Sequence, residues 1–223
     1  MSEVQPFPRA EIQRAEGAMN RAPTLAAIAE EQLGLQEDPR GSNRGAALQK
    51  FFEADNLTIP NPEPGTLNPK PQITDGYPWC AAFVSWCVQE WERRVQSSGF
   101  RVGAQFIAPR LAAVAQFPDW ARENNCLISK PWTAGWPLRG DIVIFNFSHC
   151  GIVAEITGRH FSSVEGNTNK DGGPEGYKVA SKLRDYSQVS RFIRLPIPSV
   201  IPAEAGIQNS ATEITEDKEK EAA

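Results

Sequence analysis

Apolar residues recur at helical spacing in the first half of the chain. The longest stripe predicts an amphipathic helix that begins near residue 80 and ends near Ser97, because Gly99 follows. Its apolar positions are Phe83, Val84, Cys87, Val88, Trp91 and Val95. Shorter helices are predicted over residues 25–32 (with Thr24 as N-cap), 45–54 and 109–124.

After Gly140 the pattern changes to short β-type runs. They cover residues 141–147, 150–156, 160–165, 177–183 and 189–195. A turn at residues 157–159 predicts that the second and third runs form a hairpin. Helices followed by an antiparallel meander indicate an α+β fold, in which N-terminal helices pack on an antiparallel β-sheet.

The chain of 223 residues divides into three predicted parts. Residues 1–22 read as a polar N-terminal extension, residues 23–198 as one folded domain, and residues 199–223 as an acidic disordered tail. Within the domain, a proline-rich stretch over residues 56–78 predicts a long loop that leads directly to the helix starting near residue 80.

Charge and hydropathy exclude several function classes. The formal net charge is −4, and the tail after residue 203 carries that excess with six acids and two lysines. The remainder is near neutral without a basic stripe, so we expect no nucleic-acid partner. The sequence contains no apolar run of about 18 residues, so we expect no membrane insertion. The first residues do not resemble a secretory signal. We therefore expect synthesis in the cytoplasm and any release to the cell wall or periplasm by a signal-independent route.

Cys80 is the candidate nucleophile. It follows Pro78-Trp79 and lies where the longest helix is predicted to begin. A helix N-terminus presents unpaired N–H groups and the positive end of the helix dipole, which lowers the pKa of a cysteine. The four cysteines lack CxxC or zinc-ligand spacing, so we expect free thiols and no metal site. Cys87 and Cys126 fit ordinary core packing.

A thiol nucleophile needs an imidazole base and a polar group that orients the ring. His149 begins one strand of the predicted hairpin and Glu165 ends the other, so both lie at the same end. If the turn centres on Thr157, Glu165 lies opposite His149. If it centres on residues 158–159, the two are offset by about three residues and Asn167 comes closer to His149.

Two neighbouring residues have other expected places. His160 follows the hairpin turn, so we expect it at the surface at the opposite end from Glu165. Cys150 adjoins His149, but strand alternation sends it to the other face of the sheet as a buried thiol.

Four segments that contain these residues resemble the CHAP family, cysteine- and histidine-dependent amidohydrolases and peptidases of the NlpC-related papain-like superfamily. They are residues 78–86 (PWCAAFVSW), 139–145 (RGDIVIF), 149–153 (HCGIV) and 164–168 (VEGNT). The resemblance implies a papain-like α+β fold, with Cys80 as nucleophile, His149 as base, Glu165 as orienting carboxylate and Asn167 as a supporting residue. It also implies cleavage of amide bonds in peptidoglycan, of the N-acetylmuramoyl-L-alanine amidase or endopeptidase type.

The remaining expectations concern ligands and rival functions. Aromatic residues that could line a substrate groove are Tyr77, Trp79, Trp132 and Trp136. No cofactor is expected, and the few acids before the nucleophile, chiefly Asp55 and Asp75, predict no calcium site. One alternative is a cysteine acyltransferase or amidase on a small or protein γ-glutamyl-type substrate, and another is an inactive binding module. The delivery route and any immunity partner are left open.

Overall fold

The computed structural model describes residues 24–55, 58–59, 72–73, 76–103, 105–128, 137–169 and 176–200. The helices are α2 (Leu25–Glu30), η1 (Ala46–Leu48), α3 (Gln49–Asp55), α4 (Cys80–Ser97), η2 (Val114–Gln116), α5 (Phe117–Glu123) and η3 (Tyr186–Gln188). The predicted extension over residues 1–22 lies outside the described residues, as does the predicted tail from residue 201 onward.

The strands form one main sheet and two short pairs. The main sheet contains β4 (Leu127–Ile128), β5 (Ile142–Phe145), β6 (Cys150–Thr157), β7 (His160–Thr168), β8 (Lys178–Asp185) and β9 (Val189–Ile193). Its order is β4-β9-β5-β6-β7-β8, and every neighbouring pair is antiparallel. The short pairs join β1 (Thr58–Ile59) to β2 (Gln72–Ile73) and β3 (Phe100–Arg101) to β10 (Ser199–Val200).

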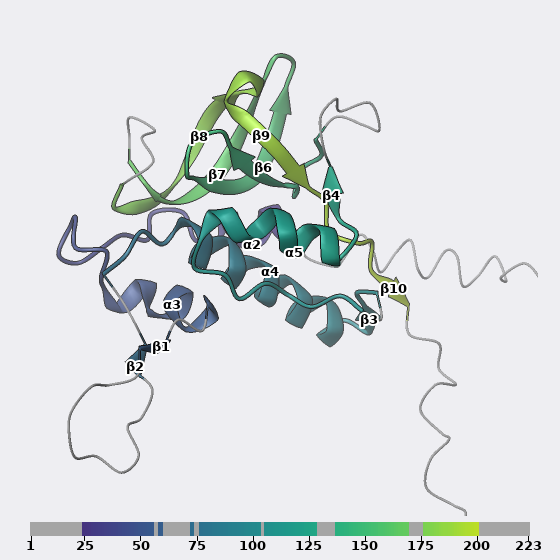
Figure 1. Cartoon of the computed structure of the whole chain (residues 1–223), viewed down its shortest axis with the longest axis horizontal. Coiled ribbons are helices and arrows are strands. Elements are labelled where there is room, and N and C mark those ends of the chain that lie inside the picture. Colours follow the sequence, from purple (N-terminus) through teal and green to yellow (C-terminus); the bar gives the residue numbers. More distant parts are fainter. Residues whose placement is uncertain are drawn as a thin grey trace, which may run out of the picture.

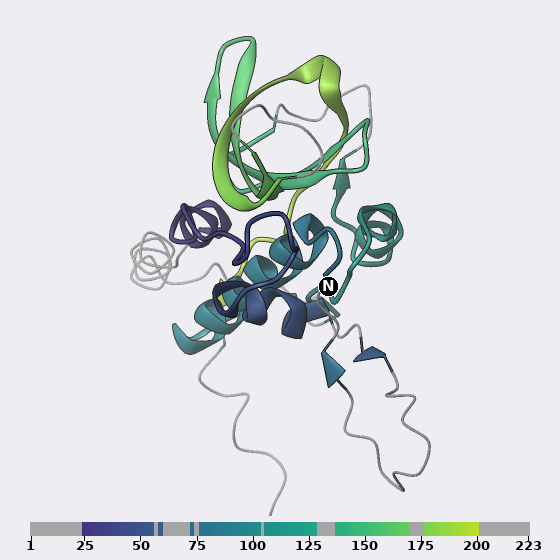
Figure 2. The same cartoon turned by 90° about the vertical axis from the view of Figure 1, so that its left-hand side faces the viewer.

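The molecule has a helical layer below a strongly curled sheet (Figures 1 and 2). Residues from β5, β6 and β7 alternate between the two faces of this sheet. One set, which includes Ile142, Ile152 and Val164, joins the main core with the helices. The other set, which includes Phe145, Val153 and Phe161, forms a second core inside the curled sheet. The predicted α+β architecture is confirmed.

Helix α4 is the central element of the helical layer. It packs against α2 and α3 and against strands β6 and β7. The predicted apolar stripe is its buried face, with Phe83, Val84 and Val95 fully inaccessible to solvent. Thr24 caps α2 as predicted, because its hydroxyl accepts a hydrogen bond from the backbone N–H of Ala27 at 3.2 Å. No described helix has the length and apolarity that a membrane span requires.

Two predicted boundaries were wrong. Residues 109–124 were predicted as one helix, but helical structure begins only at Val114, the first residue of η2. The backbone groups of residues 109 and 111 bond to side chains of α4 instead. Gln89 donates to the carbonyl of Pro109 at 2.7 Å, and the Ser85 hydroxyl bonds the backbone N–H and C=O of Leu111. In addition, Ser199–Val200 pairs with β3, so ordered structure extends past the predicted end of the domain at residue 198.

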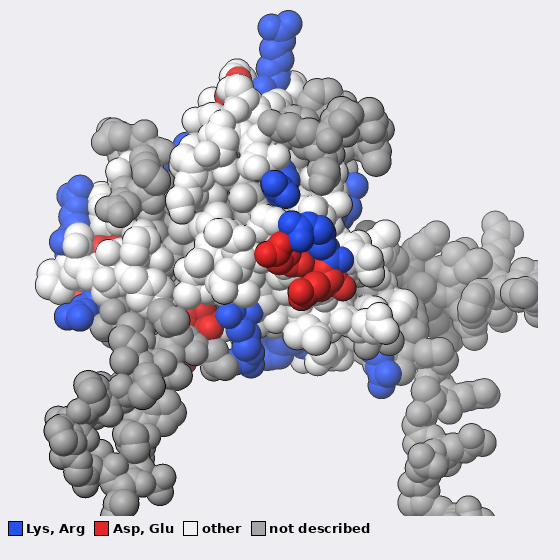
Figure 3. Space-filling model, in the orientation of Figure 1, with Lys and Arg blue, Asp and Glu red and all other residues white. Residues whose placement is uncertain are grey.

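Charged side chains on the face shown in Figure 3 form small mixed groups rather than a broad basic area. Several of the described charges are paired within one helix, as in the 2.5 Å contact between Arg122 and Asp119 on α5. This distribution fits the absence of a basic stripe from the sequence.

Candidate active site

Cys80 is the first residue of α4, and its side chain is only 4% exposed. The preceding Trp79 anchors this helix start in the core. Its indole stacks on Phe51 with ring centroids 5.7 Å apart and donates a 2.9 Å hydrogen bond from Nε1 to Oε1 of Glu37. The nucleophile candidate therefore lies at a helix N-terminus that is fixed by its neighbour.

His149 and Glu165 meet inside the curled sheet. Nε2 of His149 lies 3.0 Å from Oε2 of Glu165, and both residues are fully buried. An ionised carboxylate only accepts hydrogen bonds, so the ring proton at this contact belongs to Nε2. His149 immediately precedes β6 and Glu165 lies in β7, which places both at the predicted end of the hairpin.

The hairpin register corresponds to the second of the two predicted alternatives, yet Glu165 still reaches the ring. Thr157 pairs with His160, so the turn is Gly158-Arg159. A bulge between Val153 and Glu155 then shifts the register by one residue. The side chain of Glu165 lies over Gly151. A Cβ atom at residue 151 would lie only 2.7 Å from Cγ of Glu165. The bulge and this glycine together bring the carboxylate to His149.

Glu165 is itself held by two residues that the sequence analysis missed. Arg184 donates to Oε1 at 2.7 Å from Nε and to Oε2 at 2.5 Å from Nη2, and the Ser163 hydroxyl donates to Oε1 at 2.6 Å. Burial by itself raises the pKa of Glu165, but the contacts with Arg184 and His149 lower it below its ordinary value. Strand alternation could have found Ser163, which lies two residues before Glu165 on the same face.

Aromatic rings fix the plane of the His149 imidazole. Phe145 and Phe147 stack near the ring, with centroids 5.9 and 6.1 Å away and interplanar angles of 17° and 11°. The guanidinium of Arg184 lies 4.8 Å from the Phe145 ring centroid. The base candidate is thus oriented by a carboxylate at one nitrogen and by stacking at its faces.

The second ring nitrogen is the one available to Cys80. Nδ1 of His149 is buried and has no hydrogen-bond partner among the described residues, while Cys80 is the other titratable side chain besides Glu165 that interacts with the ring. Hydrogen bonds from Cys150 and then His149 hold the pKa of Cys80 well below its ordinary value, although burial opposes this. Burial also opposes protonation of His149, yet the contacts with Cys80 and Glu165 raise its pKa to about 9. These shifts favour a thiolate–imidazolium pair.

The other thiols have the opposite character. All four cysteines are free, as predicted. Burial raises the pKa of Cys87 well above its ordinary value and that of Cys126 to about 11, which suits unreactive packing residues. Cys150 is fully buried as predicted, and burial followed by the contact with Cys80 raises its pKa. Its contact with the nucleophile was not predicted.

Asn167 is buried two residues after Glu165 but does not bind the ring of His149. Its backbone has a φ of 52°, a left-handed conformation that asparagine tolerates better than most residues. Its Oδ1 and Nδ2 are buried without a hydrogen-bond partner among the described residues. Its supporting role stays a prediction.

The predicted substrate-lining residues lie in different places. Trp79 is fully buried in the core, so its prediction as a groove residue was wrong. Tyr77 is half-buried, and its hydroxyl donates to the carboxylate of Asp55. Trp132 and Trp136 lie outside the described residues. His160 is exposed at the far end of the hairpin, as expected.

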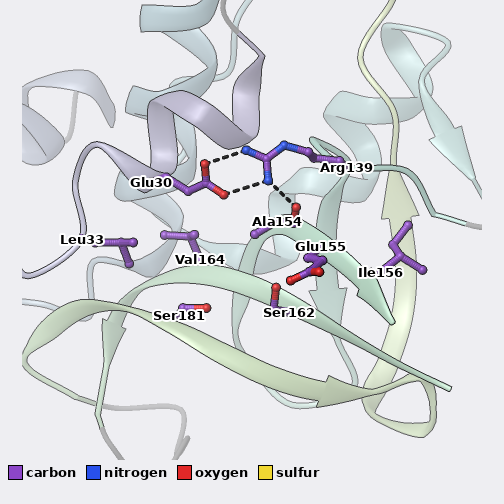
Figure 4. Close-up of a pocket in the computed structure, with 9 residues that line it drawn as sticks. All are labelled: Glu30, Leu33, Arg139, Ala154, Glu155, Ile156, Ser162, Val164 and Ser181. Carbon is purple, nitrogen blue, oxygen red and sulfur yellow. Dashed lines mark hydrogen bonds and ion pairs between the residues drawn. The ribbon is translucent and has the colours of Figure 1, made fainter. Parts of the chain in front are cut away.

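A separate cleft of about 580 Å3 lies on the opposite face of β7. Ser162 and Val164 line it (Figure 4), whereas Ser163 and Glu165 alternate with them along β7 and bond to each other. Arg139 at its rim forms a bidentate ion pair with Glu30, at 2.8 and 2.6 Å. None of the lining residues is a cysteine or histidine, so the cleft lacks the thiol and the imidazole found around Cys80.

No cluster of three histidine, cysteine, aspartate or glutamate residues in the described part of the chain could hold a metal ion. The side chains of the described site offer a thiolate at a helix N-terminus, an imidazolium beside it and a carboxylate behind the imidazolium.

Comparison with known proteins finds one family over the central part of the chain. The family model described as the CHAP domain matches residues 72–167, a range that contains Cys80, His149, Glu165 and Asn167. No curated protein and no solved structure matches the chain. The family match points to a hydrolase of amide bonds that depends on a cysteine and a histidine. The match over residues 72–167 supports assigning this part of the chain to the CHAP-domain family.

Proposed function

We propose that this protein is a thiol-dependent amidohydrolase or endopeptidase that cleaves amide bonds of peptidoglycan. The observation that carries the proposal is the buried series of contacts from Cys80 through His149 to Glu165. Its three groups supply the nucleophile, the acid–base group and the orienting carboxylate of a cysteine hydrolase. The peptidoglycan substrate rests on the resemblance of the four segments to the CHAP family.

In the proposed mechanism, the sulfur of Cys80 attacks the carbonyl carbon of the scissile amide. His149 in its imidazolium form gives a proton to the leaving amine nitrogen, and an acyl-enzyme remains on Cys80. Water then attacks the thioester while neutral His149 takes its proton. Expulsion of the thiolate releases the acid and restores the starting pair.

The oxyanion of each tetrahedral intermediate needs hydrogen-bond donors. The backbone N–H of Cys80 belongs to the first turn of α4, where N–H groups have no partner within the helix. We assign this N–H to the oxyanion, with the positive end of the α4 dipole adding to its stabilisation. Asn167 is the candidate for a second polar contact, since its side-chain amide has no hydrogen-bond partner in the part of the chain that the structure describes.

The test is digestion of purified peptidoglycan by the full chain, with the products separated and identified by mass spectrometry. We expect the wild type and Cys87→Ala to release the same fragments, because Cys87 is a packing residue on the same helix. Cys80→Ala should release none. The masses of the fragments identify the bond, either between glycan and peptide or within the peptide. The proposal would be refuted if Cys80→Ala released the same products as the wild type, or if neither the wild type nor any variant released products.

A further inference from the structure

A second thiol lies against the nucleophile. Cys150 is the first residue of β6 and Cys80 the first of α4, two elements that pack together in the main core. Each thiol interacts with the other: a hydrogen bond with Cys150 is the first cause of the lowered pKa of Cys80, and the same contact, after burial, raises the pKa of Cys150. Both residues are buried, with 4% of Cys80 and none of Cys150 exposed. A pair of thiols therefore lies at the centre of the site.

The proposed mechanism gives Cys150 no step. His149 handles the protons and Glu165 orients His149, while Cys150 points to the helix-facing side of the sheet, on which Ile152 also lies. The position requires only a small apolar side chain for packing. Besides its hydrogen bond to Cys80, a thiol there has a chemical capacity that an apolar side chain lacks, which is to form a bond with a neighbouring oxidised sulfur.

We infer that Cys80 and Cys150 form an oxidation site, at which a peroxide converts the nucleophile into a reversible disulfide. In the first step the Cys80 thiolate attacks one peroxide oxygen, the O–O bond breaks, and the departing hydroxide takes up a proton to form water. In the second step the sulfur of Cys150 attacks the sulfenic sulfur of Cys80. The S–O bond breaks, and hydroxide leaves with the proton of Cys150 as a second water. A dithiol restores the two thiols: it gives two electrons and two protons to the disulfide between Cys80 and Cys150 and is itself oxidised to a disulfide.

The surroundings select this pair over the other thiols. The thiolate is the form that reacts with peroxide, and the contacts with Cys150 and His149 favour it at Cys80. Cys87 lies seven residues further along α4, which places it about 10 Å away along the helix axis. That separation exceeds the distance between α-carbons that a disulfide spans. Of Cys87 and Cys150, only Cys150 is therefore close enough to form a disulfide with Cys80.

The pair would also protect the enzyme. A sulfenic acid without a neighbouring thiol is oxidised further to sulfinic and sulfonic acids, which dithiols do not reduce. With Cys150 in contact, the sulfenic acid is captured as a disulfide. Loss of activity during oxidation, which rests on the proposed function, would then be temporary.

The test uses the purified full chain without any substrate. The reduced protein is treated with hydrogen peroxide, its remaining thiols are alkylated with iodoacetamide, and its peptides are mapped by mass spectrometry before and after dithiothreitol. We expect Cys80 and Cys150 to lose alkylation together and to appear in one linked peptide, with a mass about 2 Da below the sum of the two free peptides. Cys87 and Cys126 should remain alkylated, and dithiothreitol should restore all four.

A matched pair of variants separates capture from general oxidation. In Cys150→Ala we expect Cys80 to become about 32 or 48 Da heavier and to resist dithiothreitol, whereas Cys87→Ala should behave as the wild type. Cys150→Ser serves the same purpose if Cys150→Ala does not fold, as judged by circular dichroism. The inference is overturned if wild-type Cys80 passes to the sulfinic acid while Cys150 stays free, if it bonds another cysteine, or if peroxide leaves both thiols unchanged.

The result is independent of the proposed function. If the linked peptide forms but the reduced protein does not cleave peptidoglycan, the proposed function fails and the oxidation site stands. If the protein cleaves peptidoglycan but forms no linked peptide, the oxidation site fails alone.

Discussion

Nε2 of His149 lies 3.0 Å from Oε2 of Glu165, and neither side chain is exposed to solvent. Both oxygens of Glu165 also accept hydrogen bonds from Arg184. The carboxylate therefore joins a buried cation to the catalytic base candidate. It fixes the ring with Nε2 protonated, which leaves Nδ1 as the nitrogen that would exchange a proton with Cys80 in the proposed mechanism.

Glu165→Gln should remove most of the activity while leaving Cys80 and His149 in place. A glutamine cannot accept both from Nε2–H and from the fork of Arg184, and it does not stabilise the imidazolium. We expect kcat/KM to fall by about 10²- to 10⁴-fold, the range that a positioned acid–base group contributes. The measurement is the initial rate of fragment release from peptidoglycan.

The control for this change is Glu155→Gln on β6. Glu155 is exposed, at the rim of the cleft on the other face of the sheet, so its substitution should leave the rate unchanged. A Glu165→Gln variant that is folded and as active as the control would remove Glu165 from the catalytic arrangement.

The pH dependence of kcat/KM should be a bell with its alkaline limb near about 9. The leaving amine needs a proton from His149, whose pKa is raised from 6.5 to about 9 by its contacts with Cys80 and Glu165 against the effect of burial. Activity therefore persists while the imidazolium is populated and falls as the pH rises through this value. The acid limb should lie below the ordinary pKa of a cysteine, because the pKa of Cys80 is lowered.

Rates measured between about pH 4 and 11 at constant ionic strength would check both limbs. Glu165→Gln should move the alkaline limb toward lower pH, since the carboxylate is one of the groups that raise the pKa of His149. An alkaline limb of the wild type near the ordinary histidine value of about 6.5 would contradict the thiolate–imidazolium pair.

Gly151→Ala should displace the carboxylate of Glu165. A Cβ at this position would lie 2.7 Å from Cγ of Glu165 and 2.9 Å from the carbonyl oxygen of Val164, closer than such atoms pack. We expect a larger loss of kcat than of substrate affinity, since the change misplaces the orienting group rather than the nucleophile. Gly103→Ala is the matched control, because nothing lies within 4 Å of its Cβ position. Equal activity of the two variants would mean that Glu165 does not need its present position.

The long helix and the hairpin were predictable because their signals are local. The apolar stripe of α4 repeats at helical spacing within 18 residues, and a two-residue turn containing Gly158 links β6 to β7. The nucleophile and base candidates followed from these two elements, since one begins at Cys80 and the other begins beside His149.

The finer geometry of the site was not predictable because it depends on contacts across strands. The bulge after Val153 changes the register without any glycine or proline signal at that point. Arg184 reaches Glu165 from a neighbouring strand 19 residues later in the chain. A tryptophan beside the nucleophile is equally compatible with a groove and with a core, and for Trp79 the hydrogen bond to Glu37 decided the outcome.

The buried position of Trp79 leads to a prediction about stability. Trp79→Phe removes the indole N–H that donates to Glu37, a residue only 2% exposed whose other carboxylate oxygen has no partner among the described residues. Leaving a buried acceptor unpaired costs about 1–3 kcal/mol, and more when it is charged.

Trp120→Phe is the comparison, because the Trp120 indole donates at 2.8 Å to the carbonyl of the exposed Ile107, which water can satisfy. Denaturant unfolding should therefore show a larger loss of unfolding free energy for Trp79→Phe, by about 1–2 kcal/mol. Equal losses would mean that the bond to Glu37 does not stabilise the start of α4, and a specific rise in KM without a loss of stability would return Trp79 to the substrate groove.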